Sequence, residues 1–470
     1  MKGFLVLLAL LALLTPAAPA SADSPLAGAD VTVAQTLGDR ELTLILRRVT
    51  AVPGPLRVDV ITHAGSAAGG LVVGLGPESH GQVRLGPKPG AYGVSLRVGH
   101  PGPWELTVSD GARTARVPFV VSRPVTSPPE RTVYGGFLAA GVLLLVSLAV
   151  ATRTRRPPWA LLPAAGVVAG VAVAITGAVL SASLPPPPAM PVDATFKTTI
   201  ADWSRPPAIL TVNDAQSGDI TLHLIDAATG LPVDDLVVHD SALMHLLVVG
   251  PAGRLWHLHP IRTGPGVFSV HLTFPRSGRY AVAAEFERRG GGVQMARSVP
   301  GLGITTAATD PAVAPPLKIS TARPATATVS GVPVSVAATR PTAASATTLT
   351  ATVGDTATLQ PWLGMLGHLI IVGPLPSGDD AQTAPIWAHA HSMGDLTPMA
   401  GMGGHGMPEM AGLMPVNGDS AADETVAAYG PSLSFTFTFP QPGRYRLWIQ
   451  AERDYRILTI PAVLDVPAVR

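Results

Sequence analysis

Two matched histidine triplets in the second half of the chain are the side chains best placed to carry chemistry. The first is His245, His257 and His259, and the second is His368, His389 and His391. Each triplet ends in a His-x-His pair, and on a β-strand both members of such a pair face the same way. Cross-strand neighbours have Cβ atoms about 5 Å apart. If the earlier histidine lies opposite the pair in a hairpin, three imidazoles can bind one metal ion.

Two alternatives to a metal site remain open from the sequence alone. One or two histidines of each triplet could be ordinary hydrogen-bonded residues at a strand edge that stabilise the local turn. A shift of one residue in the hairpin register would also move His245 to the opposite face of its sheet, away from His257 and His259.

A Met-rich segment that follows the second triplet offers softer donors. Six of the eleven methionines lie between Met393 and Met414. Thioether sulfur prefers Cu(I) or Ag(I), and imidazole suits both oxidation states of copper. The predicted ligands of this segment are Met393, Met399, Met402, Met407, Met410 and His405. The alternative is a lid whose methionines pack against apolar surface.

The amino-acid composition excludes several kinds of metal site and binding partner. The chain has no cysteine, which excludes disulfides, thiolate zinc sites, iron–sulfur clusters and a blue-copper electron-transfer centre. Lys plus Arg (32) nearly balances Asp plus Glu (31), so there is no basic field for nucleic acid. Serine–histidine–aspartate arrangements and phosphate-binding loops have no recognisable pattern here, so no catalytic residue is predicted.

The histidine triplets belong to an internal repeat. MHLLVVGP at 244 and VFSVHLTFPRSGRY at 267 match GHLIIVGP at 367 and SLSFTFTFPQPGRY at 432. Pro and Gly of the shared Phe-Pro-x-x-Gly-Arg-Tyr motif indicate a turn between strands, and its tyrosine, Tyr280 or Tyr445, is expected to fill a core. Short alternating runs between Gly and Pro indicate a further β region near the N-terminus. The predicted fold class is mainly β, with three immunoglobulin-like or cupredoxin-like β-sandwich domains and a two-helix transmembrane hairpin.

Two apolar runs predict the membrane hairpin. Each is long enough to cross about 30 Å of hydrocarbon, and they flank a short loop with three arginines, which belongs on the cytoplasmic side. Buried core helices are the alternative. The N-terminus has the layout of a signal peptide ending at Ala22, with an uncleaved anchor as the alternative. The predicted segments are a signal peptide at 1–22, β-sandwiches at 23–128, 191–304 and 317–467, transmembrane helices at 132–152 and 159–184, and a cytoplasmic loop at 153–158.

The repeat resembles the YtkA-like modules of exported bacterial proteins that are often found in copper-handling neighbourhoods. The resemblance is carried by Met244-His245-Leu246, by Trp256-His257-Leu258-His259-Pro260 and by Phe274-Pro275 with Gly278-Arg279-Tyr280, together with the matching stretch of the second copy. The second copy departs from this pattern by Ser392 in place of Pro260 and by the Met-rich insertion. The resemblance implies β-sandwich modules and a role in copper handling.

Residues and resemblance together predict a membrane-anchored, extracytoplasmic copper-binding protein, a metallochaperone or a copper resistance or homeostasis factor. It would bind Cu(I) or Cu(II), contact the bilayer through two helices, and serve a copper transporter or an oxidase assembly partner. No enzymatic activity is expected. The alternatives are an interaction module of the cell envelope without metal, and a hydrolase with a histidine-based zinc site.

Overall fold

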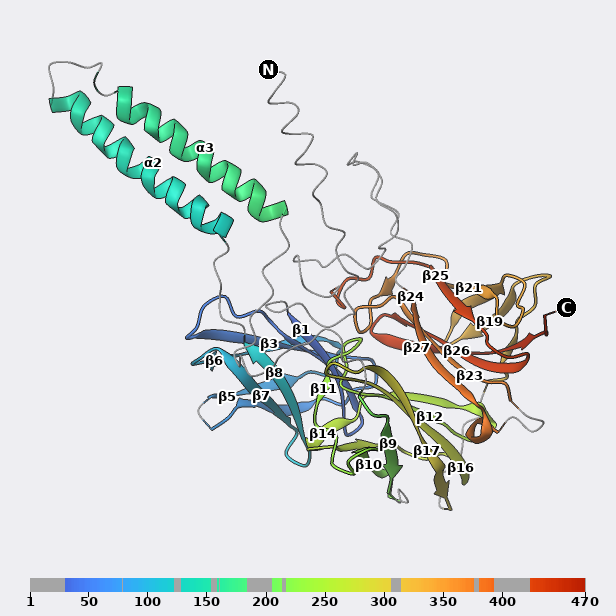
Figure 1. The fold of residues 1–470 in the computed structure, drawn as a ribbon. Coiled ribbons are helices and arrows are strands. Elements are labelled where there is room, and N and C mark those ends of the chain that lie inside the picture. The colour runs from blue at the N-terminus through green and yellow to red at the C-terminus, as the bar shows by residue number, and fades with distance from the viewer. Residues whose placement is uncertain are drawn as a thin grey trace.

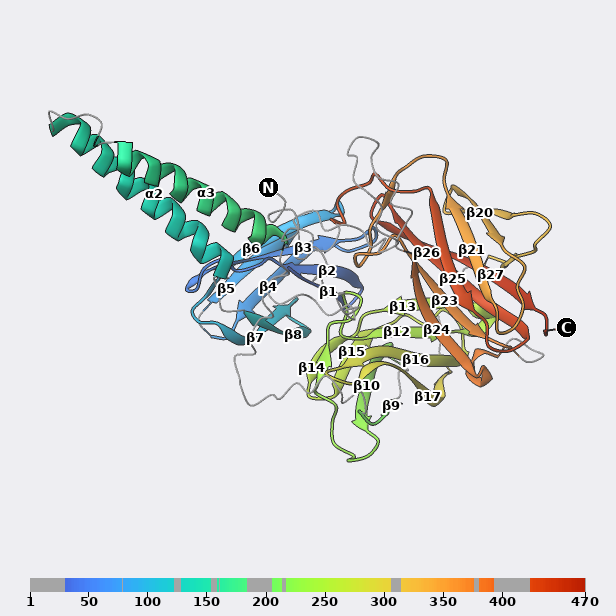
Figure 2. The same ribbon diagram turned by 45° about the horizontal axis from the view of Figure 1, so that its top comes forward.

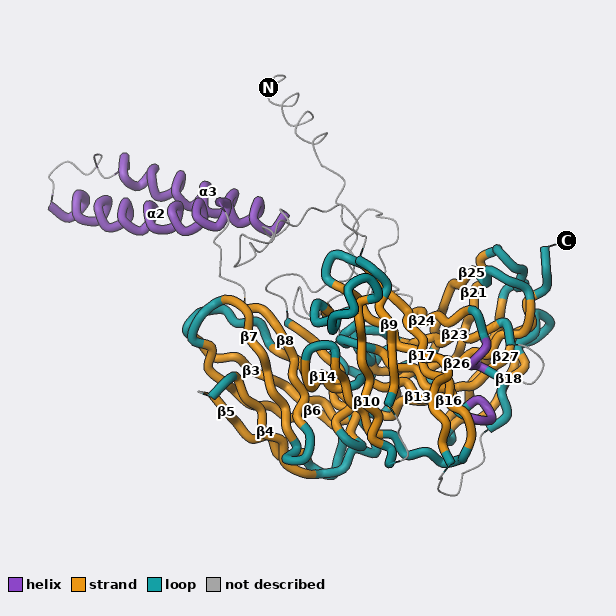
Figure 3. Tube along the Cα trace, turned by 60° about the horizontal axis from the view of Figure 1, so that its bottom comes forward, coloured by secondary structure: helices purple, strands orange, loops and turns teal. Residues whose placement is uncertain are grey.

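The prediction of a mainly β chain with two apolar helices is confirmed by a computed structural model (Figures 1 and 3). The structure describes residues 30–77, 79–121, 128–153, 159, 161–183, 205–213, 217–305, 314–375, 380–392 and 423–469. The predicted signal peptide at 1–22 and residues 154–158 of the predicted loop lie outside these ranges.

The first β region consists of two four-stranded antiparallel sheets. One sheet has the order β1 (Val31–Leu37), β2 (Arg40–Leu46), β3 (Gly54–Thr62) and β6 (Gly90–Val98). The other has the order β5 (Ser79–Leu85), β4 (Gly69–Leu75), β7 (Gly102–Ser109) and β8 (Thr114–Val121). Alternate residues of strands such as β8 are buried, and both sheets contribute to one apolar core, because one face of each excludes water.

The second β region also has two sheets around one core. The smaller has the order β14 (Ile261–Gly264), β15 (Val267–His271), β10 (Asp219–Asp226) and β9 (Ala208–Val212). The larger has the order β11 (Leu236–Val237), β16 (Gly278–Arg288), β12 (His245–Val249) and β13 (Leu255–Leu258), with β17 (Gly292–Ile304) also paired to β16.

The third β region repeats this arrangement with another core. Its larger sheet has the order β18 (Leu317–Lys318), β27 (Arg456–Val466), β26 (Gly443–Arg453), β23 (Gly367–Gly373) and β24 (Ile386–Ser392), with β22 (Leu359–Gln360) paired to β26. Its smaller sheet has the order β19 (Ala325–Val329), β20 (Val332–Ala338), β21 (Ala346–Val353) and β25 (Ser432–Thr438).

The tyrosines of the repeated motif have equivalent structural roles. Tyr280 and Tyr445 are both fully buried in the cores of their regions. The Tyr280 hydroxyl donates to the carbonyl of Arg276 at 2.6 Å, and the Tyr445 hydroxyl donates to that of Gln441 at 2.8 Å. Each buried hydroxyl is therefore satisfied, which supports the structural assignment of this motif.

The two helices, α2 (Pro128–Arg153) and α3 (Leu161–Ser183), lie side by side and project away from the β regions (Figures 1 and 2). Their backbones approach closely: a Cβ added to Gly136 would lie 2.7 Å from the carbonyl oxygen of Gly170. Both helices are long and apolar enough to cross a membrane, and only 11% of each apolar window is buried.

The three β regions meet at shared interfaces. The first contacts the second through the amide of Thr36, which donates to the carbonyl of His259 at 2.7 Å. It contacts the third through a buried pair in which His63 Nδ1 lies 2.6 Å from Glu452 Oε1. The second and third pack through an apolar cluster that includes Leu247 and Trp448. Residues from all three regions can therefore face one another at the junction.

The His63–Glu452 pair predicts a pH-dependent contribution to stability. Burial lowers the pKa of His63, but the Glu452 carboxylate outweighs it and raises the pKa from 6.5 to about 9. The contribution is fully present below pH 6.5 and is lost as the pH rises through 9. The wild-type advantage over His63→Gln in the free energy of unfolding should therefore fall by about 3 kcal/mol across this range, as measured by denaturant unfolding.

The matched control is His80→Gln, which changes an exposed histidine of the same β region and should leave the pH profile unaltered. If the free energies of unfolding of wild type and His63→Gln differ by the same amount at pH 6 and pH 10, the pair makes no pH-dependent contribution to stability.

Candidate metal centre

The first histidine triplet converges on one point. Strand β12 pairs with β13 in a register that places Leu247 opposite His257, which leaves His245 on the same side as the His-x-His pair. His245 Nδ1 lies 3.1 Å from His257 Nε2 and 3.2 Å from His259 Nε2. The alternative register, which would separate His245 from the pair, does not occur.

The second triplet has the same geometry. Strand β23 pairs with β24 so that His368 lies opposite His391. His389 Nε2 lies 3.1 Å from His368 Nδ1 and 3.2 Å from His391 Nε2. As in the first triplet, the inward atoms are Nδ1 of the first histidine and Nε2 of the pair. Within each triplet, one ring nitrogen of each histidine lies within 4.8 Å of one ring nitrogen of the other two.

The two triplets also contact each other. The ring centre of His389 lies 4.8 Å from that of His257 and 5.0 Å from that of His245. The rings of His257 and His368 are 5.7 Å apart. The structure therefore brings the histidines of both repeats together in one six-histidine cluster.

Two tight turns position the first histidine of each triplet. His239 and Ala242 exchange main-chain hydrogen bonds, and so do Trp362 and Met365. The central residues all have positive φ, including Asp240 at 47° and Leu363 at 55°. This is the pattern of a type I′ turn, which costs a non-glycine residue about 1 kcal/mol.

Each turn presents a carbonyl to the outward nitrogen of a histidine. His245 Nε2 lies 3.2 Å from the carbonyl oxygen of His239, and His368 Nε2 lies 3.1 Å from that of Trp362. A carbonyl can only accept, so the proton of each neutral imidazole is on Nε2. Nδ1, which points into the cluster, therefore carries a lone pair.

The second and third β regions exchange the acceptors that orient two other histidines. His257 Nδ1 donates to Gln450 Oε1 of the third region at 2.8 Å. His389 Nδ1 lies 3.1 Å from Glu285 Oε1 of the second. Gln450 and Glu285 hold equivalent positions, because each pairs across the sheet with the first histidine of its own repeat. Gln450 Oε1 can only accept, and a Glu285 oxygen can accept from His389 in the same way, so both histidines present Nε2 inward.

The remaining two histidines face carboxylates from other regions. His259 Nδ1 lies 2.5 Å from Glu41 Oε1 of the first region. His391 Nδ1 lies 3.5 Å from Asp240 Oδ2 of the second. All six outward nitrogens therefore face an oxygen acceptor, the arrangement that orients metal-binding histidines.

Burial keeps the inner histidines neutral. The pKa values of His245, His257, His368 and His389 are held well below 6.5, first by burial and then by neighbouring histidines. In each triplet two of these neutral histidines therefore direct an inward lone pair at each other. A proton on one inward nitrogen could form a hydrogen bond with only one neighbouring nitrogen, whereas one cation can accept lone pairs from three nitrogens. Nitrogens about 2.0–2.1 Å from one ion would be about 3.3 Å apart, close to the observed spacing.

The cluster is shielded from solvent. Trp362 is buried, and its ring lies edge-on to His257, His259 and His368 at 4.7–5.8 Å. His391 has a side chain that is 15% exposed. Entry of an ion is therefore expected beside His391.

Three further residues form a carboxylate-rich group beside the cluster: His239, Asp240 and Glu285 lie within 4.8 Å of one another through their ligand atoms. His239 Nε2 is 2.8 Å from Asp240 Oδ2. Burial raises the pKa of Glu285 to about 8. Because Asp240 and Glu285 also contact His391 and His389, this group is part of the shell that orients the cluster.

Sequence reasoning missed the orienting residues. No pattern in the sequence marks His239, Asp240 or Glu41 as an orienting residue. Glu285 and Gln450 had a usable signal, since each is a polar residue at the same position of a strand that is otherwise mostly apolar. The predicted ligands of the Met-rich segment, Met393, Met399, Met402, Met407, Met410 and His405, lie outside the described residues.

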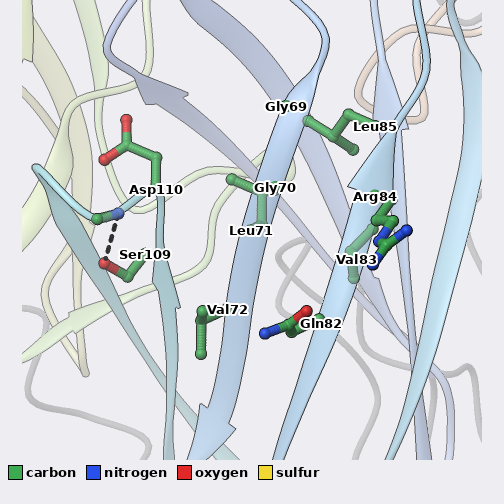
Figure 4. A pocket seen from close by; sticks show the side chains of 11 residues that line it. Gly69, Gly70, Leu71, Val72, Gln82, Val83, Arg84, Leu85, Ser109 and Asp110 are labelled. Atoms are coloured by element: carbon green, nitrogen blue, oxygen red, sulfur yellow. Dashed lines mark hydrogen bonds between the residues drawn. The ribbon is translucent and has the colours of Figure 1, made fainter.

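A surface groove in the first β region is separate from this cluster. It has a volume of about 480 Å³ and is lined by residues of β4 and β5 with Ser109, Asp110 and Gly111 (Figure 4). None of the six histidines lines it. The groove therefore adds nothing to the metal chemistry of the junction.

Comparison with known proteins assigns no function to the chain. Residues 327–468, which include the second triplet, match a family described as a domain of unknown function, DUF8832. This match covers less than half of the chain. No curated protein matches.

Solved structures show only weak likeness. A tetra-tandem repeat from the extending region of a large adhesion protein is 10% identical over 93% of this chain and 74% of its own, with a TM-score of 0.15. Latent PorU from Porphyromonas gingivalis is 10% identical over 93% and 33%, with a TM-score of 0.14. Salmonella alpha-2-macroglobulin reacted with methylamine is 8% identical over 95% and 24%, with a TM-score of 0.17. Such scores carry no argument about function.

The hydrogen bonds predict one tautomer for each inner histidine of the metal-free protein. His245 and His368 should carry their proton on Nε2, and His257 and His389 on Nδ1. All four should stay neutral when the pH falls below 6.5, because their pKa values are lowered. Histidine-selective ¹⁵N NMR measures both properties. Imidazolium shifts at pH 6, or the opposite tautomers, would contradict this geometry.

Proposed function

We propose that this chain is an extracytoplasmic, membrane-anchored copper-binding protein whose six-histidine cluster holds the metal. The observation that carries the proposal is that every outward nitrogen of the cluster faces an oxygen acceptor. The inward nitrogens are then directed at a common point, where one ion can accept their lone pairs. A metal ion in each triplet satisfies three of them at once, as imidazole ligands with oriented outer nitrogens do elsewhere.

The donor set favours copper. Imidazole binds copper and zinc well, and copper stands above zinc in general affinity. The Met-rich segment begins one residue after Ser392, close in sequence to the most exposed histidine of the second triplet, and its thioethers suit Cu(I). The predicted role of these methionines as additional ligands remains part of the proposal.

The proposed role is copper storage or transfer without catalysis, in a resistance or homeostasis system with a copper transporter or an oxidase assembly protein as partner. Deep burial suits retention of an ion. An interaction module without metal would leave six facing imidazoles at a domain junction unexplained. The paired sheets support β-sandwich modules. The proposal includes the finer assignment of these modules as immunoglobulin-like or cupredoxin-like.

The proposal predicts tight copper binding that depends on the cluster. A competition titration of the full chain in detergent against a chromophoric chelator measures affinity for Cu(I) and Cu(II). Combining His257→Ala with His389→Ala should weaken binding more than about 100-fold, because ligand loss exceeds the effect of losing an orienting residue. The control combines His80→Ala with His100→Ala, which changes exposed histidines of the first region.

A third variant changes Met393, Met399, Met402, Met407 and Met410 to Leu. If only this variant loses Cu(I), the Met-rich segment is the site and the cluster is not. If wild type binds no copper, the proposal fails.

The membrane topology is tested separately. Two apolar helices joined by an arginine-containing loop support a hairpin whose loop faces the cytoplasm and whose flanking β regions face outward. The chain has no cysteine, so Thr154→Cys and Ser95→Cys each provide one label site. An impermeant maleimide should label Ser95→Cys on intact cells, and Thr154→Cys only after lysis. Labelling of Thr154→Cys on intact cells would contradict this topology.

A further inference from the structure

We propose that the two histidine triplets form a single two-metal centre, in which two copper ions share a small bridging anion of the hydroxide or azide class. This inference rests on the proposed copper function and extends it. The sequence repeat alone would suggest two independent sites, one in each β region. Three features of the cluster support a shared centre.

The first feature is proximity. The ring of His389, from the second triplet, lies 4.8 Å from His257 and 5.0 Å from His245 of the first. These are direct contacts between imidazoles of different triplets. Two-metal sites hold their ions about 3.5–4 Å apart. Ligand rings in contact are required for ions at such a spacing.

The second feature is reciprocity. Gln450 of the third region orients His257, and Glu285 of the second orients His389. Each triplet therefore depends on the opposite β region for the orientation of one ligand. Two independent sites would not need an acceptor from the opposite region. In a centre formed at the junction, packing of the two regions orients both sets of ligands together.

The third feature is charge and coordination. Three carboxyl groups contact ligand histidines: those of Glu41, Asp240 and Glu285. Acidic groups beside the ligands can offset part of the positive charge of two Cu²⁺ ions in a buried site, and a bridging monoanion offsets a further part. Three imidazoles per ion also leave an open coordination position on each ion. A small anion between the ions fills both positions.

Electron paramagnetic resonance (EPR) of the full chain tests the inference. The first equivalent of Cu(II) should give a signal, and the second should remove most of it, because two bridged Cu(II) ions pair their spins. Acid denaturation should restore the signal of all the copper, which confirms that none was reduced. Azide should bridge the two ions of the two-copper protein and add a second absorption band to the single band that terminal azide gives in one-copper variants.

His257→Ala and His389→Ala each leave one triplet intact, and each should bind one copper that stays visible by EPR. The shared centre is wrong, while copper binding stands, if wild type binds two coppers that both remain fully visible by EPR and azide gives only the band seen in the single variants. If wild type binds no copper, the proposed function itself fails. The wild-type spin count needs no variant, so a folding defect in either substitution does not affect this decision.

Discussion

The contact between each outward imidazole nitrogen and an oxygen acceptor is the interaction on which the rest of the structure depends. It sets which nitrogen of each neutral histidine carries the proton, and therefore which nitrogen points inward with a lone pair. Two acceptors are carbonyls of type I′ turns, one of which holds Leu363 at a positive φ. A locally unfavourable backbone is retained at the place where it orients His368, as is common at functional sites.

The same contacts explain why three β regions pack at one junction. His259 of the second region takes its acceptor from Glu41 of the first, and the second and third regions exchange Gln450 and Glu285. Apolar packing such as that of Leu247 and Trp448 brings the second and third together, and the buried His63–Glu452 pair ties the first to the third. Packing of the three regions therefore also supplies acceptors that orient the cluster.

Local patterns predicted much of this architecture. Alternating runs predicted a mainly β chain, apolar runs predicted two long helices, and the repeat located both triplets and the buried Tyr280 and Tyr445. Pairing between triplets was not predictable, because it depends on contacts between residues as distant as His257 and Gln450. Glu41 had no local signal at all, since nothing in its strand marks it as a partner of a histidine more than two hundred positions away.

The central claim is that metal lies in the six-histidine cluster. Anomalous diffraction at the copper edge, from crystals of the copper-loaded full chain, tests it most directly. The account predicts one strong peak within each triplet, bounded by His245, His257 and His259 and by His368, His389 and His391. Copper peaks found only beside the Met-rich segment, or an empty cluster at full loading, would contradict it.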